Sequence, residues 1–125
     1  METTIKVTLP EDFMSLCTIY QIKPEFFIQT FIDQVSFPVF YSRPHQNDRW
    51  ATFFFLKYLD VEETAYEVNE ELEDQYLELF TKMVKQNFID HQDDPVEVEK
   101  AAREIMNQWL NAVLAERSQY IIDNL

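Results

Sequence analysis

Residues 94–113, DPVEVEKAAREIMNQWLNAV, combine the start of a helix with a long apolar stripe. Asp94 can cap the helix, Pro95 is tolerated in its first turn, and Glu97 stands where a capping box has its reciprocating glutamate. Apolar side chains then recur at helical spacing, at Val98, Ala102, Ile105, Trp109 and Val113. The stretch predicts an amphipathic helix whose apolar side packs against another part of the chain.

Four more helices are predicted towards the N-terminus from patterns of the same kind. Two of them open with a proline, over about 10–21 and 24–36, and a third begins near Trp50, where Asp48 can cap it. Three successive phenylalanines at 53–55 point in three directions, which predicts burial on most sides of that helix. The longest helix spans about 64–88, with a stripe made of Ala65, Val68, Leu72, Tyr76, Leu79, Phe80 and Met83.

Residues 3–9, TTIKVTL, alternate polar and apolar side chains, which is the pattern of a half-buried strand. One face would hold Ile5, Val7 and Leu9, and the other Thr4, Lys6 and Thr8. A lone strand leaves its backbone hydrogen bonds unmade, so the expected partner is the same strand of a second subunit. The sequence therefore predicts a mainly α homodimer in which an N-terminal β-strand, paired as a ribbon, is followed by about five helices.

The front of the chain has a strand, then Leu9, Pro10 and Glu11, a helix, a short turn, and a helix with isoleucine at 28 and 32. Residues 3–35, about a quarter of the chain, thus resemble the ribbon-helix-helix family. The resemblance implies that the ribbon enters the DNA major groove and that the start of the second helix binds phosphate. Carried over by position, these DNA-binding roles would fall to Thr4, Lys6, Thr8 and Lys23. The turn before the second helix departs from the family pattern, because it has no glycine and lacks the usual Ser/Thr-Arg opening.

The chain has 125 residues, which suits a single domain over 1–125, and it contains no glycine. P-loops, dinucleotide fingerprints and nucleophile elbows are thereby excluded, because each needs glycine for a tight turn or a close backbone approach. The 23 acidic and 10 basic residues give a formal charge of -13. This charge disfavours DNA, whose affinity for proteins comes mostly from neutralised phosphates, and leaves a basic protein as a possible partner.

Side chains suited to catalysis are few. His45 and His91 stand in no metal-binding motif, and Cys17, the only cysteine, falls on the apolar face of the first helix. We expect no catalytic residue, no metal, no cofactor and no enzymatic activity. The single cysteine, the absence of a signal-like N-terminus and the lack of a long apolar run favour a cytoplasmic protein with no membrane contact.

Residues 60–78 hold nine acidic side chains and no lysine or arginine. One interpretation is a surface for a basic partner, or a nucleic-acid mimic that competes for a nucleic-acid-binding protein. The alternative is a solvated helix face, on which glutamates near the helix start suit the macrodipole. The candidate partner-binding residues are Glu62, Glu63, Glu67, Glu70, Glu71, Glu73 and Asp74.

A small basic patch interleaved with aromatic residues precedes this acidic segment. It comprises Arg43, His45, Arg49 and Trp50. Such a patch can stack bases or grip phosphates. The alternative is that its cations pair with the acidic helix while the neighbouring aromatic rings fill the core.

The sequence therefore predicts a non-enzymatic dimeric binding protein in three parts. Residues 3–35 would form the dimerisation segment, 36–49 a loop, and 50–125 a three-helix C-terminal part. The two prolines and the missing periodicity of 36–49 are the signs of a loop. Two functions stay open, a DNA-binding transcriptional regulator and an acidic protein-interaction module that works through residues 60–78.

Overall fold

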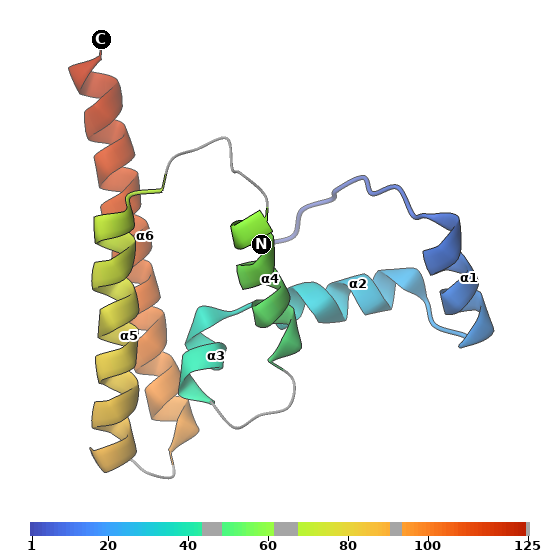
Figure 1. Cartoon of the computed structure of the whole chain (residues 1–125), viewed down its shortest axis with the longest axis horizontal. Helices are drawn as coiled ribbons and strands as arrows, with labels where there is room; N and C mark the ends of the chain where they lie inside the picture. Colours follow the sequence, from blue (N-terminus) through green and yellow to red (C-terminus); the bar gives the residue numbers. More distant parts are fainter. Residues whose placement is uncertain (44–48, 62–67, 91–93, 125) are drawn as a thin grey trace. The chain divides into compact units, whose positions relative to one another are not determined.

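The computed structural model describes residues 1–43, 49–61, 68–90 and 94–124, and every element of secondary structure in these ranges is a helix. In chain order they are α1 (Glu11–Ile19), α2 (Pro24–Asp33), α3 (Phe37–Ser42), α4 (Trp50–Val61), α5 (Glu70–Asp90) and α6 (Pro95–Asp123) (Figure 1). The mainly α fold class is confirmed.

The predicted N-terminal β-strand is wrong. Residues 1–10 precede α1 without forming a strand, and no strand occurs elsewhere in the described ranges. A segment becomes a strand only when its backbone N–H and C=O groups pair with a neighbouring extended segment. The alternation at Ile5, Val7 and Leu9 meets the side-chain requirement of a strand, but the described residues hold no second strand to pair with it. The β-ribbon is therefore not seen in this fold, and the homodimer through residues 3–35 stays a prediction.

The chain divides into two compact units, Met1–Gln34 (unit 1) and Val35–Leu125 (unit 2). Unit 1 contains α1 and α2, and unit 2 contains the other helices named above. The boundary falls at the end of the predicted front segment, 3–35. A single domain over the whole chain stays a prediction.

In unit 1 the turn after α1 is a Schellman motif built without glycine. The N–H of Ile22 donates to the carbonyl of Cys17 at 2.8 Å, and the N–H of Gln21 donates to that of Thr18 at 3.3 Å. Gln21 has a φ of 56°, the left-handed conformation that glycine usually supplies. The motif ends α1 and lets α2 begin at Pro24, where a first-turn proline is tolerated.

The two helices of unit 1 meet through few side chains. The rings of Phe13 and Phe27 lie 5.6 Å apart between centroids, and Cys17 is buried at 5% exposure. The predicted placement of Cys17 on the apolar face of the first helix is confirmed. Several other apolar side chains of the unit are largely exposed, including Leu16, Ile19, Phe26 and Ile32.

Gln21→Gly is expected to stabilise unit 1 by up to about 1 kcal/mol, because glycine adopts the left-handed conformation without a Cβ penalty. Hydrogen exchange of the Ile22 amide, which closes the motif, should then slow by up to about fivefold. Gln21→Ala is the control, because alanine keeps the Cβ. Equal exchange in the two variants would show that the conformation of this residue does not limit the stability of the turn.

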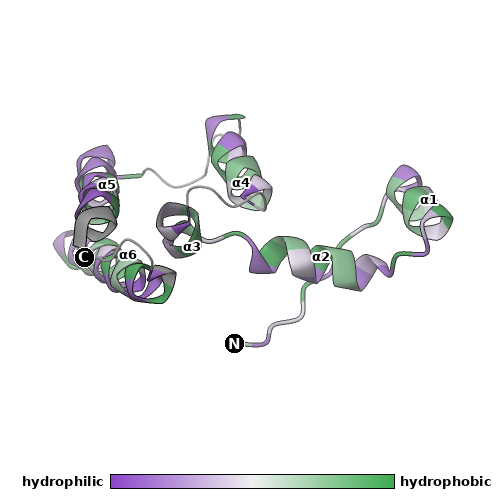
Figure 2. Ribbon diagram, turned by 90° about the horizontal axis from the view of Figure 1, so that it is seen from below, coloured by the Kyte–Doolittle hydropathy of each residue, from purple (hydrophilic) through white to green (hydrophobic). Residues whose placement is uncertain are grey.

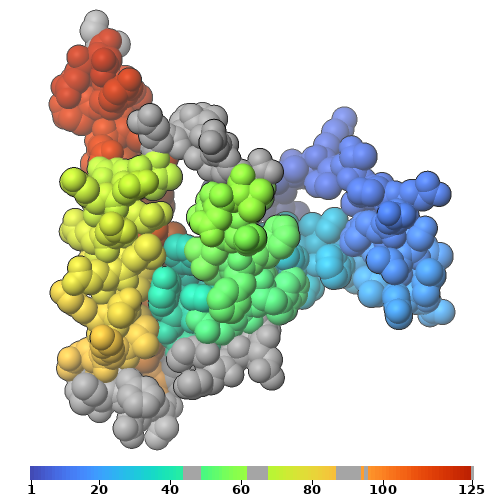
Figure 3. All heavy atoms as spheres, in the orientation of Figure 1, coloured from blue at the N-terminus to red at the C-terminus, as the bar shows by residue number. Residues whose placement is uncertain are grey.

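Unit 2 is built on a hairpin of α5 and α6, which lie antiparallel and side by side (Figures 1 and 3). Their facing stripes form a core of buried residues, Phe80, Met83, Val98 and Ala102, with Leu77, Val84, Ile105 and Trp109 packed against it. The predicted stripe of α6 is confirmed from Val98 to Trp109. The stripe of 64–88 is confirmed in its second half; Val68 is exposed and Ala65 lies outside the described residues.

The short helix α3 lies within the stretch 36–49 that was predicted to be a loop. Ser36 caps it by accepting a hydrogen bond from the N–H of Val39 at 3.2 Å, and Pro38 stands in its first turn. The helix was not predicted because the stretch contains two prolines. The first of them, Pro38, lies in the first turn of α3, where a helix accepts proline. The part of the predicted loop from 44 to 48 lies outside the described residues.

Aromatic rings hold α3 against the hairpin. The ring of Phe37 packs edge-on to Phe80 with centroids 6.3 Å apart and stacks on Trp109 at 6.2 Å. Tyr41, one turn along the same side of α3, stacks on Phe80 with its ring centroid 4.9 Å away and the two rings almost parallel. A helix of only six residues has little stability of its own, so these contacts keep α3 folded.

The helix α4 is attached to α3 along one side. The N–H of Ser36 donates to the Thr52 hydroxyl at 3.0 Å, and both Thr52 and Ala51 are buried. The predicted burial of residues 53–55 on most sides is wrong, because these three phenylalanines are 40–60% exposed. Three successive large side chains cannot all face the one side on which a helix is covered.

Phe80→Ala is expected to lower the free energy of unfolding by about 3–5 kcal/mol, because it leaves a cavity among α3, α5 and α6. Urea unfolding followed by tryptophan fluorescence measures this loss. Tyr58→Ala on the exposed side of α4 is the control and should cost about 1 kcal/mol or less. Similar losses in both variants would contradict the placement of the core at Phe80.

Candidate interaction surfaces

The residues assigned to DNA binding lie in unit 1. Thr4, Lys6 and Thr8 are exposed in the segment before α1. Lys23 directly precedes α2, with its ammonium 5.3 Å from the ring centroid of Phe26. Their assignment to base edges and phosphate followed from a ribbon that this fold does not form.

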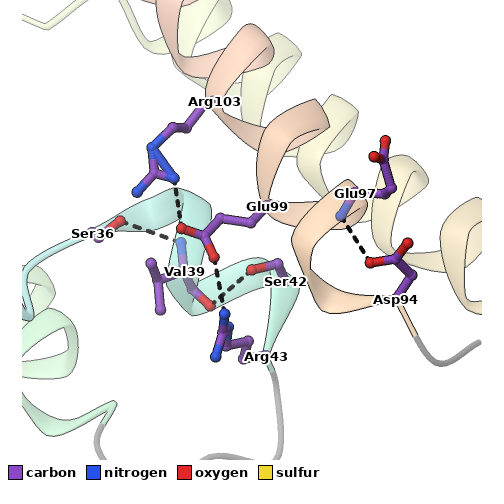
Figure 4. A network of polar contacts seen from close by, with 8 residues as sticks. All are labelled: Ser36, Val39, Ser42, Arg43, Asp94, Glu97, Glu99 and Arg103. Atoms are coloured by element: carbon purple, nitrogen blue, oxygen red, sulfur yellow. Dashed lines mark hydrogen bonds and ion pairs between the residues drawn. The ribbon is translucent and has the colours of Figure 1, made fainter.

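In the predicted basic patch, Arg43 forms an ion pair within unit 2. Its guanidinium lies 3.2 Å from a carboxylate oxygen of Glu99 on α6 (Figure 4). The other oxygen of Glu99 pairs with Arg103, one turn along the same helix, at 2.7 Å. Arg43 thus links α3 to α6. Its partner, Glu99, is not among the candidate residues predicted from the sequence.

Arg49 is engaged with aromatic groups. Its guanidinium carbon stands 3.7 Å from the ring centroid of Phe40 and 5.4 Å from that of Phe53, and it donates to the backbone carbonyl of Phe40 at 3.0 Å. Trp50 is partly exposed, and His45 lies outside the described residues. The structure therefore gives both arginines of the patch partners inside unit 2, but the ion pair of Arg43 is with α6 and not with the acidic segment 60–78 that the alternative named.

Tyr41, two residues before Arg43 in sequence, has a perturbed phenol. Burial raises the pKa of Tyr41 above its usual value of 10.0, and the positive charge of Arg49 opposes that shift. Because the folded-state pKa lies above the unfolded one, the unfolded chain releases this proton first as the pH rises. The stabilisation is fully present below pH 10 and is lost as the pH climbs from there through the folded-state pKa.

Tyr41→Phe is therefore expected to reduce the loss of stability between pH 9 and pH 11. The free energy of unfolding in urea, measured at several pH values in this interval, reports the effect. Tyr120→Phe, which removes a largely exposed phenol, is the control. The same alkaline loss in wild type and Tyr41→Phe would exclude this tyrosine as its source.

The described part of the acidic segment lies mainly on α5. Glu70, Glu71 and Asp74 are exposed and Glu73 is half-buried, whereas Glu62, Glu63 and Glu67 lie outside the described residues. Glu70, Asp74 and Glu78 follow one another at intervals of four, so they share one face of the helix. Of these, Glu78 pairs with Lys82 at 3.1 Å.

Asn69 joins this acidic stretch to α6. Its side-chain oxygen accepts from the N–H of Leu72 at 3.1 Å and so caps α5, while its amide nitrogen donates to Glu116 of α6 at 2.7 Å. Glu116 therefore lies beside the start of α5. Glu116 is thus at the end of the hairpin where the acidic stretch of α5 begins, and we call this region, defined as Glu70, Glu71, Asp74, Glu78 and Glu116, the acidic end.

The helix α6 continues beyond the start of α5 (Figures 1 and 3). Tyr120 lies one turn past Glu116 and is 69% exposed. Val68, next to the capping Asn69, is also exposed. Two exposed apolar side chains therefore border the acidic end. The sequence pattern predicted that Val68 belongs to a buried stripe, and it gave no prediction for Tyr120.

Sequence reasoning also missed a second apolar stripe on α6. Its members, Met106, Leu110, Leu114 and Ile121, are between 37% and 61% exposed and lie on a different side of the helix from Val98, Ala102 and Trp109. One signal in the sequence marks it, because residues 105–115 contain no charged side chain in a chain that is 26% charged.

Within the described ranges, no group of three or more His, Cys, Asp or Glu side chains is placed to hold a metal ion. Asp94 accepts from the N–H of Glu97 at 3.3 Å and caps α6 as predicted, and His91 lies outside the described residues. No described helix is both long enough and apolar enough to cross a membrane.

Comparison with known proteins yields no relative. No protein-family model, no curated protein and no solved structure matches this chain. No match therefore supports the resemblance of residues 3–35 to the ribbon-helix-helix family. The strand that this family requires is also absent from the described residues.

Proposed function

We propose that this chain is a non-enzymatic protein-binding module that holds a basic partner at the acidic end of the α5–α6 hairpin. The observation that carries the proposal is the run of exposed carboxylates along the start of α5, where the hydrogen bond from Asn69 also brings Glu116 of α6 beside the start of the helix. A region of one charge sign attracts and orients a partner of the opposite sign.

The acidic face of α5 carries an internal cost that a basic partner removes. Like charges four residues apart on a helix destabilise it by roughly 0.2–0.5 kcal/mol per pair. Glu70 and Asp74 form such a pair, and the second pair, Asp74 and Glu78, is weakened because Glu78 also pairs with Lys82. A helix face that serves only for solvation more often alternates its charges. Lysine or arginine side chains of a partner would turn this repulsion into attraction.

The apolar side chains at the same end favour a protein partner over a simple cation. Tyr120 presents an exposed ring next to the turn that carries Glu116, and Val68 adjoins the start of α5. An aromatic face beside carboxylates can receive the cation and the aliphatic stem of a lysine or arginine together. We therefore expect the partner to offer basic residues on an amphipathic helix.

Reversing Glu70, Glu71 and Asp74 to Lys is expected to weaken binding of a labelled 18-residue lysine–leucine amphipathic peptide by about tenfold or more at 50 mM salt. Fluorescence anisotropy measures the affinity. For the wild type, affinity should also fall as salt rises, because exposed charges are screened. Circular dichroism checks that α5 tolerates the loss of acidic side chains from its first turn.

The matched control is the triple reversal of Glu2, Glu97 and Glu104 to Lys, which changes the net charge equally and also alters a first-turn glutamate, Glu97 of α6. It should leave the affinity within about twofold of wild type if the site is local. Equal weakening by the two triple variants would mean that the peptide responds to net charge alone, and the proposed site would then be abandoned.

A further inference from the structure

We infer that two copies of this chain pair through the second apolar stripe of α6, antiparallel and around a two-fold axis. This pairing goes beyond the proposed function, because it uses a different side of the helix from the acidic end. It replaces the ribbon as the basis for a homodimer.

The stripe is formed by side chains that the α5–α6 core does not cover. Met106, Leu110 and Leu114 follow one another at intervals of four and are 37%, 52% and 48% exposed, and Ile121 extends the same face at 61%. The core side of α6 lies about a quarter to a third of a turn away, at Val98, Ala102, Ile105 and Trp109. Figure 2 shows green, hydrophobic positions interspersed with polar ones along the ribbon of α6.

This stripe stands on a rigid support. α6 has 29 residues and is therefore about 43 Å long, and it is fixed along one side by α5 and α3. Asp94 caps its start, and the Asn124 side chain donates to the carbonyl of Tyr120 at its end. A preformed helix face loses little conformational entropy when it is covered, which favours its use as an interface.

The charge pattern identifies the occupant as a second copy. Residues 105–115 are uncharged, whereas the chain as a whole carries -13, so this is the part of the helix where two copies can approach with least repulsion. A basic partner would find no carboxylate here, and it would find several at the acidic end. An uncharged apolar helix face is matched by another face of the same kind.

The register follows from the positions of the charges that flank this segment. An axis level with Ala112 places Leu110 of one copy against Leu114 of the other. It also places Arg117 opposite Asn107 and Arg103 opposite Ile121, so no like charges face each other along the stripe. The aliphatic part of Arg103 can then cover the isoleucine.

The area available matches a modest, reversible dimer. A large apolar side chain has on the order of 200 Å² of accessible surface, so the four stripe residues offer about 400 Å², and the polar side chains at their edges raise this to about 600 Å². Stable interfaces bury roughly 600–1,000 Å² per partner. We therefore expect a dissociation constant on the order of micromolar.

Sedimentation velocity on the full chain, from about 1 to 200 μM, tests the pairing. The wild type is expected to dimerise in this range, and more strongly at 500 mM than at 50 mM salt, because salt screens the repulsion between two acidic chains. Leu110→Glu should weaken dimerisation at least tenfold. Val96→Glu adds the same charge at an exposed apolar position on the same side of α6 but beyond the overlap of the two helices, and should leave dimerisation within about twofold.

A wild type that stays monomeric at 200 μM and 500 mM salt would overturn the inference. So would a dimer that survives Leu110→Glu, because self-association would then lie elsewhere in the chain. An equal effect of Val96→Glu would also overturn it, since added charge alone would then explain the change.

Cysteine pairing tests the register with variants that add no charge. A mixture of the Leu110→Cys and Leu114→Cys chains is expected to form disulfide-linked dimers several times faster than either variant alone under air oxidation. Faster linking of one variant with itself would exclude the antiparallel register centred on Ala112. The native Cys17 is buried and is present equally in every sample.

Discussion

The ring of Phe80 is the contact on which the rest of unit 2 depends. It is fully buried where α3, α5 and α6 meet, with Tyr41 stacked on it and Phe37 against its edge. The pair α5 and α6 forms the support, α3 is held to it by these rings and by the Arg43–Glu99 ion pair, and α4 is held to α3 through Ser36 and Thr52. Each helix is therefore ordered by the one added before it, and a loss at Phe80 reaches α4 through α3.

Most of the helices could be predicted from the sequence because their local signals are strong and their apolar periodicity is regular. Asp94 with Pro95 marks the start of α6, and the stripe from Val98 to Trp109 marks its buried side. The signals failed where tertiary context decides. TTIKVTL has the alternation of a strand but no neighbour to pair with in the described chain, and α3 is a single short helix that only its aromatic contacts stabilise.

The candidate surfaces show the same division. The acidic residues of α5 were visible as a cluster in the sequence, but their junction with Glu116 depends on the antiparallel hairpin and on one hydrogen bond from Asn69. Arg43 and Arg49 looked like a shared basic patch, yet folding directs one to Glu99 and the other to the ring of Phe40. The outer stripe of α6 was hidden because a helix with two apolar sides looks in sequence like one with a single broad side.

The burial of Cys17 has a practical consequence for studying unit 1. It is the only thiol in the chain, and the folded helix pair keeps it almost entirely from solvent. A thiol reagent can modify it only while α1 and α2 are apart, because the reaction requires access to the sulfur. The rate of labelling thus reports the opening of unit 1 in the natural sequence, without a spectroscopic tag. Unit 2 contains no cysteine and does not contribute to this rate.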